Sequence, residues 1–101
     1  MTTTKINVQQ RAGIRQVDGL AFGPVAVVST GRGRHYIVHV ETGYQLGAAI
    51  SNWRLALKLA RRIAEPSNAE YFYGLEANKL TNRHKSASKV FSRLVDEIFG
   101  K

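Results

Sequence analysis

The chain has 101 residues, no cysteine and a formal net charge of +8. This length suits one domain, the lack of cysteine excludes disulfides and thiolate zinc sites, and neither a signal-peptide core nor a membrane-spanning apolar run is present. The 15 Lys and Arg against 7 Asp and Glu favour a polyanionic partner. We therefore expect a single soluble, cytoplasmic domain over residues 1–101 that does not associate with membranes.

The first residues follow the two-residue hydrophobic period of β-strands. Ile6 and Val8 alternate with polar residues, and a second short apolar run covers residues 14–17. This run leads into Asp18-Gly19, a dipeptide typical of tight hairpin turns. The pattern predicts two short strands, the second of which ends in a turn.

The strongest strand signals follow Gly23-Pro24. Residues 25–30 and 35–40 predict a hairpin joined by the loop Gly31-Arg32-Gly33-Arg34, and residues 44–46 predict a further short strand. In the second strand of the hairpin, alternation assigns one face to Tyr36, Val38 and Val40 and the other to His35, Ile37, His39 and Glu41. The strand-rich part, residues 5–47, is thus predicted to be an antiparallel meander of three to five strands.

The second part, residues 51–100, has the period of helices. Ser51 or Asn52 can cap a helix that should end before Pro66, because the residue before a proline disfavours helical geometry. A capping box at 67–70 predicts a short helix reaching Leu80, and a last helix follows residue 85. The predicted fold class is α+β, with an N-terminal antiparallel β-meander packed against two to three C-terminal α-helices.

The first predicted helix carries a stripe of like charge. Its cations recur at i, i+4, i+7 and i+8 and fill a sector roughly 100° wide, opposite an apolar side; they are Arg54, Lys58, Arg61 and Arg62. Like charges at i, i+4 cost a few tenths of a kcal/mol, so an all-positive stripe favours contact with an anion. The alternative is a solvated helix face whose charge is neutralised by acids from elsewhere in the fold.

Further cations lie outside this stripe. Arg32 and Arg34 occupy the tip of the predicted hairpin, where two guanidinium groups can straddle a phosphate backbone or enter a minor groove. The alternative is that the glycines form the turn and the arginines keep it soluble. Lys85 and Lys89 lie on the polar side of the last helix and complete the candidate nucleic-acid-binding set.

Catalytic and metal-binding patterns are weak. His35 and His39 share a strand face but lie roughly 13 Å apart, too far to bind one metal ion. His39 and Glu41 are close enough to share a site, yet no third ligand is evident. The sequence contains no nucleophile elbow, His-Glu-x-x-His run or paired-carboxylate motif. We expect no enzymatic activity, no metal and no cofactor.

An aromatic run at residues 71–73 has two interpretations. Tyr71 and Tyr73 could offer stacking surfaces to unpaired bases. The favoured interpretation is that Phe72 belongs to the core while both tyrosines pack at its rim. The apolar side of the last helix is expected to cover the sheet of its own chain.

The stretch from about Val25 to Ala64 resembles sheet-reading DNA-binding modules of the AP2-like and integrase-arm type. The resemblance rests on a hairpin, a third strand and an amphipathic helix, with Leu46-Gly47 before the helix. In that family the sheet enters the major groove and the helix packs behind it. The resemblance implies these base readers: Arg32, Arg34, His35, His39 and Gln45. This chain departs from the pattern because its densest positive charge lies on the helix, so sheet and helix are alternative binding faces.

The leading hypothesis is a small basic nucleic-acid-binding module that contacts mainly the phosphate backbone, with DNA favoured over RNA. Neutralising about six duplex phosphates predicts a slope near −5 for log affinity against log salt. A second hypothesis is a protein-binding adaptor or inhibitor, of the kind phages and other mobile elements encode, that docks a basic face on an acidic protein. A third is a structural protein that forms a homodimer or larger oligomer through a strand edge or the last helix.

Overall fold

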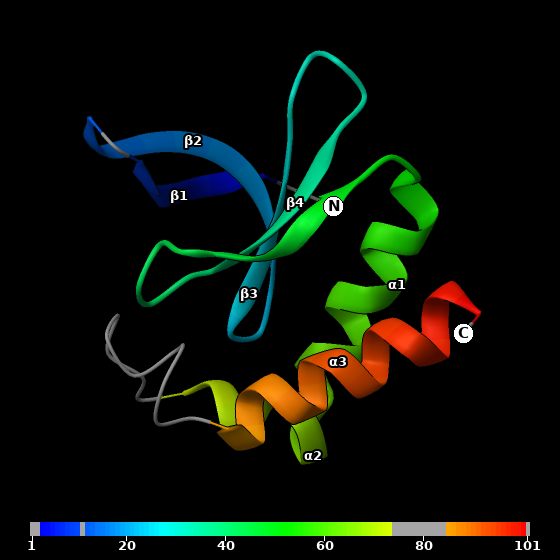
Figure 1. Ribbon diagram of the computed structural model, residues 1–101. Coiled ribbons are helices and arrows are strands. Elements are labelled where there is room, and N and C mark those ends of the chain that lie inside the picture. Colours follow the sequence, from blue (N-terminus) through cyan, green and yellow to red (C-terminus); the bar gives the residue numbers. More distant parts are fainter. Residues whose placement is uncertain (1–2, 11, 74–84, 101) are drawn as a thin grey trace.

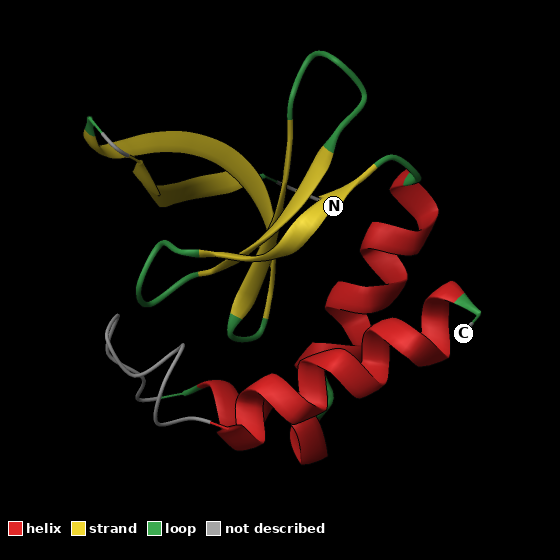
Figure 2. Cartoon of the chain, viewed as in Figure 1, coloured by secondary structure: helices red, strands yellow, loops and turns green. Residues whose placement is uncertain are grey.

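The computed structural model describes residues 3–10, 12–73 and 85–100. One antiparallel five-stranded sheet, with its strands in chain order, precedes the helices (Figures 1 and 2). Its elements are β1 (Thr4–Gln10), β2 (Gly13–Phe22), β3 (Val25–Ser29), β4 (His35–His39), β5 (Gln45–Ile50), α1 (Trp53–Ala64), α2 (Pro66–Ala69), the 3₁₀ helix η1 (Glu70–Phe72) and α3 (Lys85–Phe99). The predicted fold class, a β-meander packed against C-terminal helices, is confirmed.

Strand β2 changes partner halfway along its length. It pairs with β1 as far as Gly19 and with β3 from Leu20 onward. A Cβ atom on Gly19 would lie 2.9 Å from Cγ1 of Ile6 and 3.1 Å from the carbonyl oxygen of Val27. The predicted turn at Asp18-Gly19 is therefore wrong, because this glycine permits close packing inside a strand. The chain turns between β1 and β2, and again at Gly23-Pro24.

The sheet curls until its first strand meets the turn between β4 and β5. The amide of Gln9 donates to the carbonyl of Gly43 at 2.8 Å. Gly43 has φ +78°, and a Cβ atom there would lie 2.7 Å from the carbonyl oxygen of Asn7. Only glycine fits this approach, and the curl leaves one face of the sheet concave.

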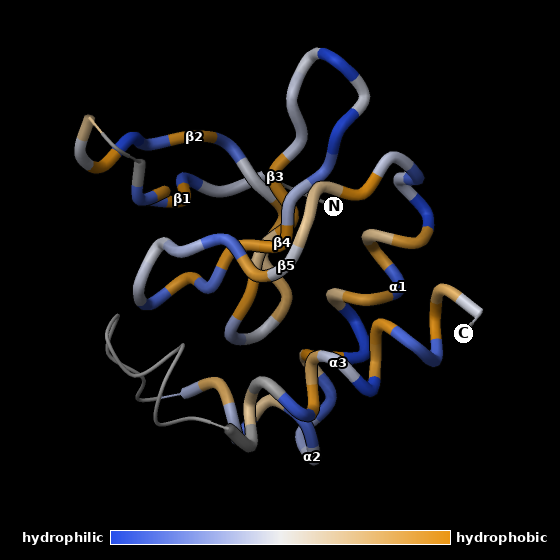
Figure 3. Tube along the Cα trace, viewed as in Figure 1, coloured by the Kyte–Doolittle hydropathy of each residue, from blue (hydrophilic) through white to orange (hydrophobic). Residues whose placement is uncertain are grey.

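The two faces of the sheet bury different clusters. The covered face packs against the helices through buried residues of β3, β4, α1, η1 and α3: Val25, Val27, Ile37, Ala56, Leu59, Ala60, Ile63, Phe72, Ala87, Val90, Leu94 and Ile98. The opposite face, here the open face, has a smaller cluster of Ile6, Ala26 and Val38, with Val8, Val17, Val28 and Tyr36 partly buried against it. Hydrophobic residues recur along both the strands and the helices (Figure 3). The predicted alternation of Tyr36 and Val38 against Ile37 and His39 is confirmed, although β4 ends before Val40.

Helix α1 begins where its cap was predicted. The side-chain oxygen of Asn52 accepts hydrogen bonds from the amides of Arg54 at 3.0 Å and Leu55 at 3.2 Å. The helix ends at Ala64, before Pro66, as expected. Glu65 caps α1 with an extended backbone, which redirects the chain into the next helix.

The predicted capping box at residues 67–70 is wrong. Helix α2 begins at Pro66, and its N-cap, Glu65, forms no side-chain capping hydrogen bond. Proline is favoured at the first helical position because its missing N–H has no partner there in any case. Ser67 therefore lies inside the helix, and the predicted continuation to Leu80 falls outside the described residues after Tyr73.

Strand β5 is longer than predicted and irregular. It runs from Gln45 to Ile50 rather than over 44–46, and its register with β4 shifts between the pairs Ile37–Leu46 and His35–Ile50. Gly47 has φ +71° within this bulge. The extra residues bring the chain directly to the start of α1.

Within the part of the chain that the structure describes, no helix is both long enough and apolar enough to cross a membrane.

Candidate functional site

The loop between β3 and β4 is held by its own hydrogen bonds. The amide of Thr30 donates to the carbonyl of Arg34 at 2.9 Å, and the Thr30 hydroxyl oxygen accepts from the amide of Arg32 at 3.3 Å. Gly33 turns the chain with φ +74°. Arg32 and Arg34 are both exposed. The loop thus presents two guanidinium groups to solvent on a closed turn.

The base of this loop contacts the beginning of α1. Oγ of Ser29 lies 2.7 Å from Nδ1 of His35, and the His35 ring centroid lies 4.9 Å from that of Trp53 at an interplanar angle of 55°. Trp53 is the first residue of α1, and Arg54 follows it. The loop and the start of α1 lie at the same end of the molecule (Figure 1). Cations from two separate segments therefore lie at the same end of the molecule, and we call Arg32, Arg34 and Arg54 the basic end.

The stripe on α1 divides into free and engaged cations. Arg54, Lys58 and Arg61 are exposed, whereas Arg62 is only partly exposed. The guanidinium carbon of Arg61 lies 5.9 Å from the centroid of the Phe22 ring on β2. This cation–π contact leaves the Arg61 charge available to an anion.

Arg62 is engaged by two acids. Its Nε donates to Oε2 of Glu97 at 2.8 Å and its Nη2 to Oε1 of the same carboxylate at 3.0 Å, while Nη1 donates to Glu65. Hydrogen bonding by Arg62 lowers the pKa of Glu97, and the charges of Arg62, Arg93 and Lys58 act in the same direction. The same hydrogen bonds raise the pKa of Arg62. For Arg62, the alternative prediction is therefore correct, namely that acids from elsewhere in the fold neutralise the charge of the helix face.

A buried amide extends this contact between α1 and α3. Asn68 is 4% exposed, its Nδ2 donates to the carbonyl of Arg62 at 2.8 Å, and its Oδ1 accepts from Arg93 at 2.9 Å. Arg93 is thereby tied to the helix packing. The segment after α1 thus supplies a polar joint that sequence periodicity does not indicate.

The two remaining predicted cations lie elsewhere. Lys85 is the first residue of α3, and Lys89 is exposed on its first half. The start of α3 lies at the opposite end of the molecule from the hairpin loop (Figure 1). The structure therefore does not bring Lys85 and Lys89 together with the basic end.

His39 cannot read bases. It is fully buried on the covered face, where Nε2 lies 2.5 Å from the carbonyl oxygen of Phe72 and Nδ1 lies 2.8 Å from the hydroxyl of Thr42. A carbonyl only accepts, so Nε2–H donates to Phe72, and Nδ1 pairs with the Thr42 hydroxyl. His35 also faces the helices, through its contact with Trp53. The structure thus contradicts the role of base readers that the sheet-reading resemblance implies for His35 and His39.

The neighbouring acid does not complete a metal site. Oε1 of Glu41 lies 3.9 Å from Nε2 of His39. No group of three or more His, Cys, Asp and Glu side chains with suitable geometry occurs among the described residues. Phe72 is buried and both adjacent tyrosines are exposed, as the core interpretation of residues 71–73 predicts.

The open face carries a cavity of about 690 Å³ that sequence reasoning missed. Its apolar wall consists of Val8, Val17, Val28, Tyr36 and Val38, and its polar wall of Gln9, Arg15, Asp18, Ser29, Thr30, Gly31 and Gln45. We call this cavity the sheet hollow. Thr30 and Gly31 belong to the hairpin loop, so the hollow adjoins the basic end. In the sequence, the only sign of the sheet hollow was the alternation that assigned Tyr36 and Val38 to one face of the sheet.

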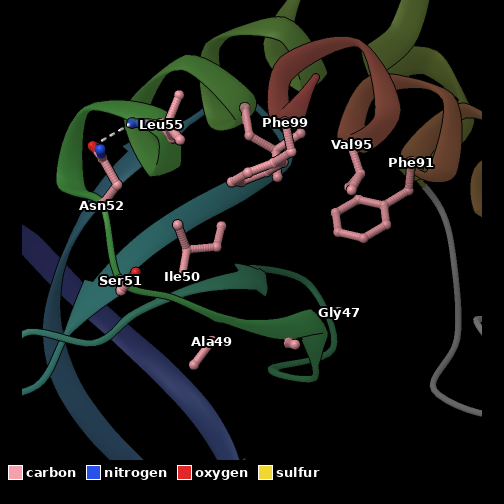
Figure 4. Close-up of a pocket in the computed structure, with 11 residues that line it drawn as sticks. Gly47, Ala49, Ile50, Ser51, Asn52, Leu55, Phe91, Val95 and Phe99 are labelled. Atoms are coloured by element: carbon pink, nitrogen blue, oxygen red, sulfur yellow. Dashed lines mark hydrogen bonds between the residues drawn. The ribbon is translucent and has the colours of Figure 1, made fainter. Parts of the chain in front are cut away.

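A second cavity has a different chemistry. About 420 Å³ in volume, it lies between β5, α1 and α3 and is lined mainly by apolar groups. Ile50, Phe91, Val95 and Phe99 surround it in Figure 4. A Cβ atom on Gly47 would lie 2.9 Å from the Phe91 ring, so this glycine lets β5 approach α3. None of the described residues that line it is charged, so this cavity is unsuited to a polyanion.

Comparison with known proteins found no matching family, no similar curated protein and no similar solved structure.

Proposed function

We propose that this protein is a non-enzymatic nucleic-acid-binding module that grips the phosphate backbone with its basic end. The observation that carries the proposal is the contact of His35 with Trp53, because it joins the loop bearing Arg32 and Arg34 to the helix bearing Arg54. Cations grouped on one surface attract a polyanion far more effectively than the same charges scattered.

The exposed cations of α1 add to the positive charge of the loop. Arg54, Lys58 and Arg61 are exposed, and none forms an ion pair with a described residue, in contrast to Arg62. Together with the two loop arginines they are five cations able to contact phosphates. Five neutralised duplex phosphates predict a slope of about −4.5 for log affinity against log salt.

The test is fluorescence anisotropy with a labelled DNA duplex over a range of salt concentrations. We expect the double variant Arg32→Glu/Arg34→Glu to bind at least about tenfold more weakly at low salt and to reduce the slope by about 2. Both side chains are exposed, so circular dichroism should show an unchanged fold.

A matched pair of single variants tests the location. Arg54→Glu and Lys89→Glu make the same charge change at exposed positions in the first turn of α1 and the first half of α3, and the starts of these helices lie at opposite ends of the molecule (Figure 1). We expect Arg54→Glu to lower both affinity and slope, and Lys89→Glu to change affinity only through net charge. Equal effects of the two would contradict the basic end as the site. Failure of the unaltered protein to bind duplex, single-stranded DNA or RNA at low salt would overturn the proposal in favour of an acidic protein partner.

A further inference from the structure

We propose that the sheet hollow binds an unpaired base of a single-stranded nucleic acid, stacked on Tyr36, while the flanking phosphates contact Arg15 and the hairpin loop. This inference rests on the proposed function, since it assigns a class of nucleic acid to a surface next to the basic end.

The apolar wall of the hollow suits a base. Tyr36 pairs in register with Val28 on β3 and belongs to the partly buried residues around Ile6, Ala26 and Val38. One part of its ring packs on these residues, and the remainder borders the cavity. An aromatic ring held in this way offers a preformed stacking surface, and every nucleobase has a π-face to match it.

The polar wall suits the edge of a base. Gln9, Gln45 and Thr30 provide amide and hydroxyl groups around the hollow. The Gln45 side chain is oriented by a hydrogen bond of 2.8 Å from its Nε2 to the carbonyl of Gly47. A cavity of about 690 Å³ has the size of a small-ligand site, and its apolar and polar walls can receive the face and the edge of a base respectively.

The charges at the rim favour an anionic strand. Arg15 is exposed on β2, and Asp18, the one acid among the described residues that line the hollow, forms an ion pair of 2.7 Å with Lys5. The wall continues through Thr30 and Gly31 into the loop that bears Arg32. A strand that places a base in the hollow would thus have positive charge along its backbone.

Duplex DNA does not fit this arrangement. Its bases are paired and stacked inside the helix, so their faces cannot reach a tyrosine within a concave sheet surface. β1 and the first half of β2 curve away from the helices and border the hollow (Figures 1 and 2). A single strand can follow such a concave surface, because its backbone bends freely and its bases are unstacked at low cost.

The experiment compares labelled single-stranded DNA, single-stranded RNA and duplex DNA by anisotropy. Tyr36→Leu keeps an apolar side chain but removes the π-face, and Tyr36→Phe keeps the ring. We expect Tyr36→Leu to weaken single-strand binding by about 5- to 100-fold and to leave duplex binding within about twofold. Tyr36→Phe should retain single-strand affinity within about twofold.

A second variant keeps the test decisive if Tyr36→Leu fails to fold. Arg15→Gln alters an exposed side chain and should reduce the salt slope for a single strand by about 0.7, the value for one phosphate contact. Binding of RNA with the same variant dependence as DNA would support a site that recognises the base and phosphate rather than the sugar.

Three outcomes would overturn the inference. Wild-type binding to duplex but not to single strands would remove the hollow as a base site and leave the proposed function standing. Unchanged single-strand affinity in a folded Tyr36→Leu protein, or an unchanged salt slope in Arg15→Gln, would do the same. Absence of binding to all three probes at low salt would instead refute the proposed function itself.

Discussion

The two faces of the sheet use neighbouring residues of the same strands for different purposes. On the covered face Val27 and Ile37 are completely buried against α1. On the open face their neighbours Val28 and Tyr36 are only partly buried and line the sheet hollow. The covered face is therefore expected to supply most of the stability, while the open face keeps apolar surface available to a ligand.

This difference follows from what lies above each face. Two helices, joined by the ion pair between Arg62 and Glu97 and by the buried Asn68, cover this face and leave one apolar cavity beside β5. Among the described residues, the open face is covered by the curl of β1 and β2, which is sufficient to bury Ile6 but leaves Tyr36 partly exposed. A partly buried aromatic surface is common at binding sites because ligand contact completes its burial.

The largest expected effect comes from the same substitution on each face. Val27→Ala removes buried methyl groups and should lower the free energy of unfolding by about 2–3 kcal/mol, from lost burial plus the cavity left behind. Val28→Ala should cost about 1 kcal/mol or less, because Val28 is partly solvated already. Urea unfolding measures both values. Equal losses would show that the open face is as important to folding as the covered one.

A smaller effect is expected from the histidine buried on the covered face. His39→Leu removes the donor that reaches the carbonyl of Phe72 and should cost about 2 kcal/mol, since a buried acceptor is left without a partner. Thr42→Val removes the hydroxyl that pairs with Nδ1 and that accepts from the amide of Tyr44 at 3.3 Å, and it should cost about half as much because this contact is only partly buried. Thermal and urea unfolding measure the pair. A His39→Leu protein as stable as the wild type would contradict a structural role for this hydrogen bond.

The smallest expected effect concerns the joint between α1 and α3. Because Arg62 lowers the pKa of Glu97 in the folded protein, the ionised carboxylate stabilises the fold above the pKa it has when unfolded. That contribution is lost as the pH falls through the lowered folded-state pKa. Glu97→Gln should therefore be less stable than the wild type at pH 7, and the difference should shrink in acid.

The adjacent acid on α3 is the control for this pH dependence. Asp96 is exposed and forms no ion pair with a described residue, so Asp96→Asn should unfold with nearly the wild-type dependence on pH. Urea midpoints between pH 7 and pH 3 make the comparison. A stability difference for Glu97→Gln that stays constant across this range would contradict the assigned contribution of the ion pair.

Much of the fold was predictable because its signals are local. The alternation of residues 35–39 correctly assigned Ile37 and Tyr36 to opposite faces, and Asn52 and Pro66 correctly bounded α1. Two errors have a common cause. In both cases a local composition has a different purpose in the fold. Asp18-Gly19 has the composition of a turn, but Gly19 is required for packing within β2. Residues 67–70 have the composition of a helix cap, but the helix already begins at Pro66.

The candidate site was only partly predictable. The cations of the hairpin loop and of α1 were identified in the sequence, and the grouping of Arg32, Arg34 and Arg54 at one end depends on the contact between His35 and Trp53. Arg62 is lost from the free set through Glu65, at i+3, and through Glu97, 35 residues further along the chain. The spacing of Arg62 and Glu65 is visible in the sequence, whereas the His35–Trp53 contact and the Arg62–Glu97 ion pair have no signature in the residues around them.

By itself the sequence determined the order of strands and helices, the buried side of each, and the excess of positive charge. The elements and their buried sides follow from hydrophobic periods of 2 and 3.6 residues, which can be recognised within one strand or a few helical turns. The excess of positive charge follows from composition. Only the tertiary structure decided which cations remain free and that a concave, aromatic-bearing hollow adjoins them. Both depend on the curl of the sheet and on contacts between segments that are far apart in the sequence. The energy of these contacts is set by distances in the folded protein, which the spacing of residues along the chain does not give.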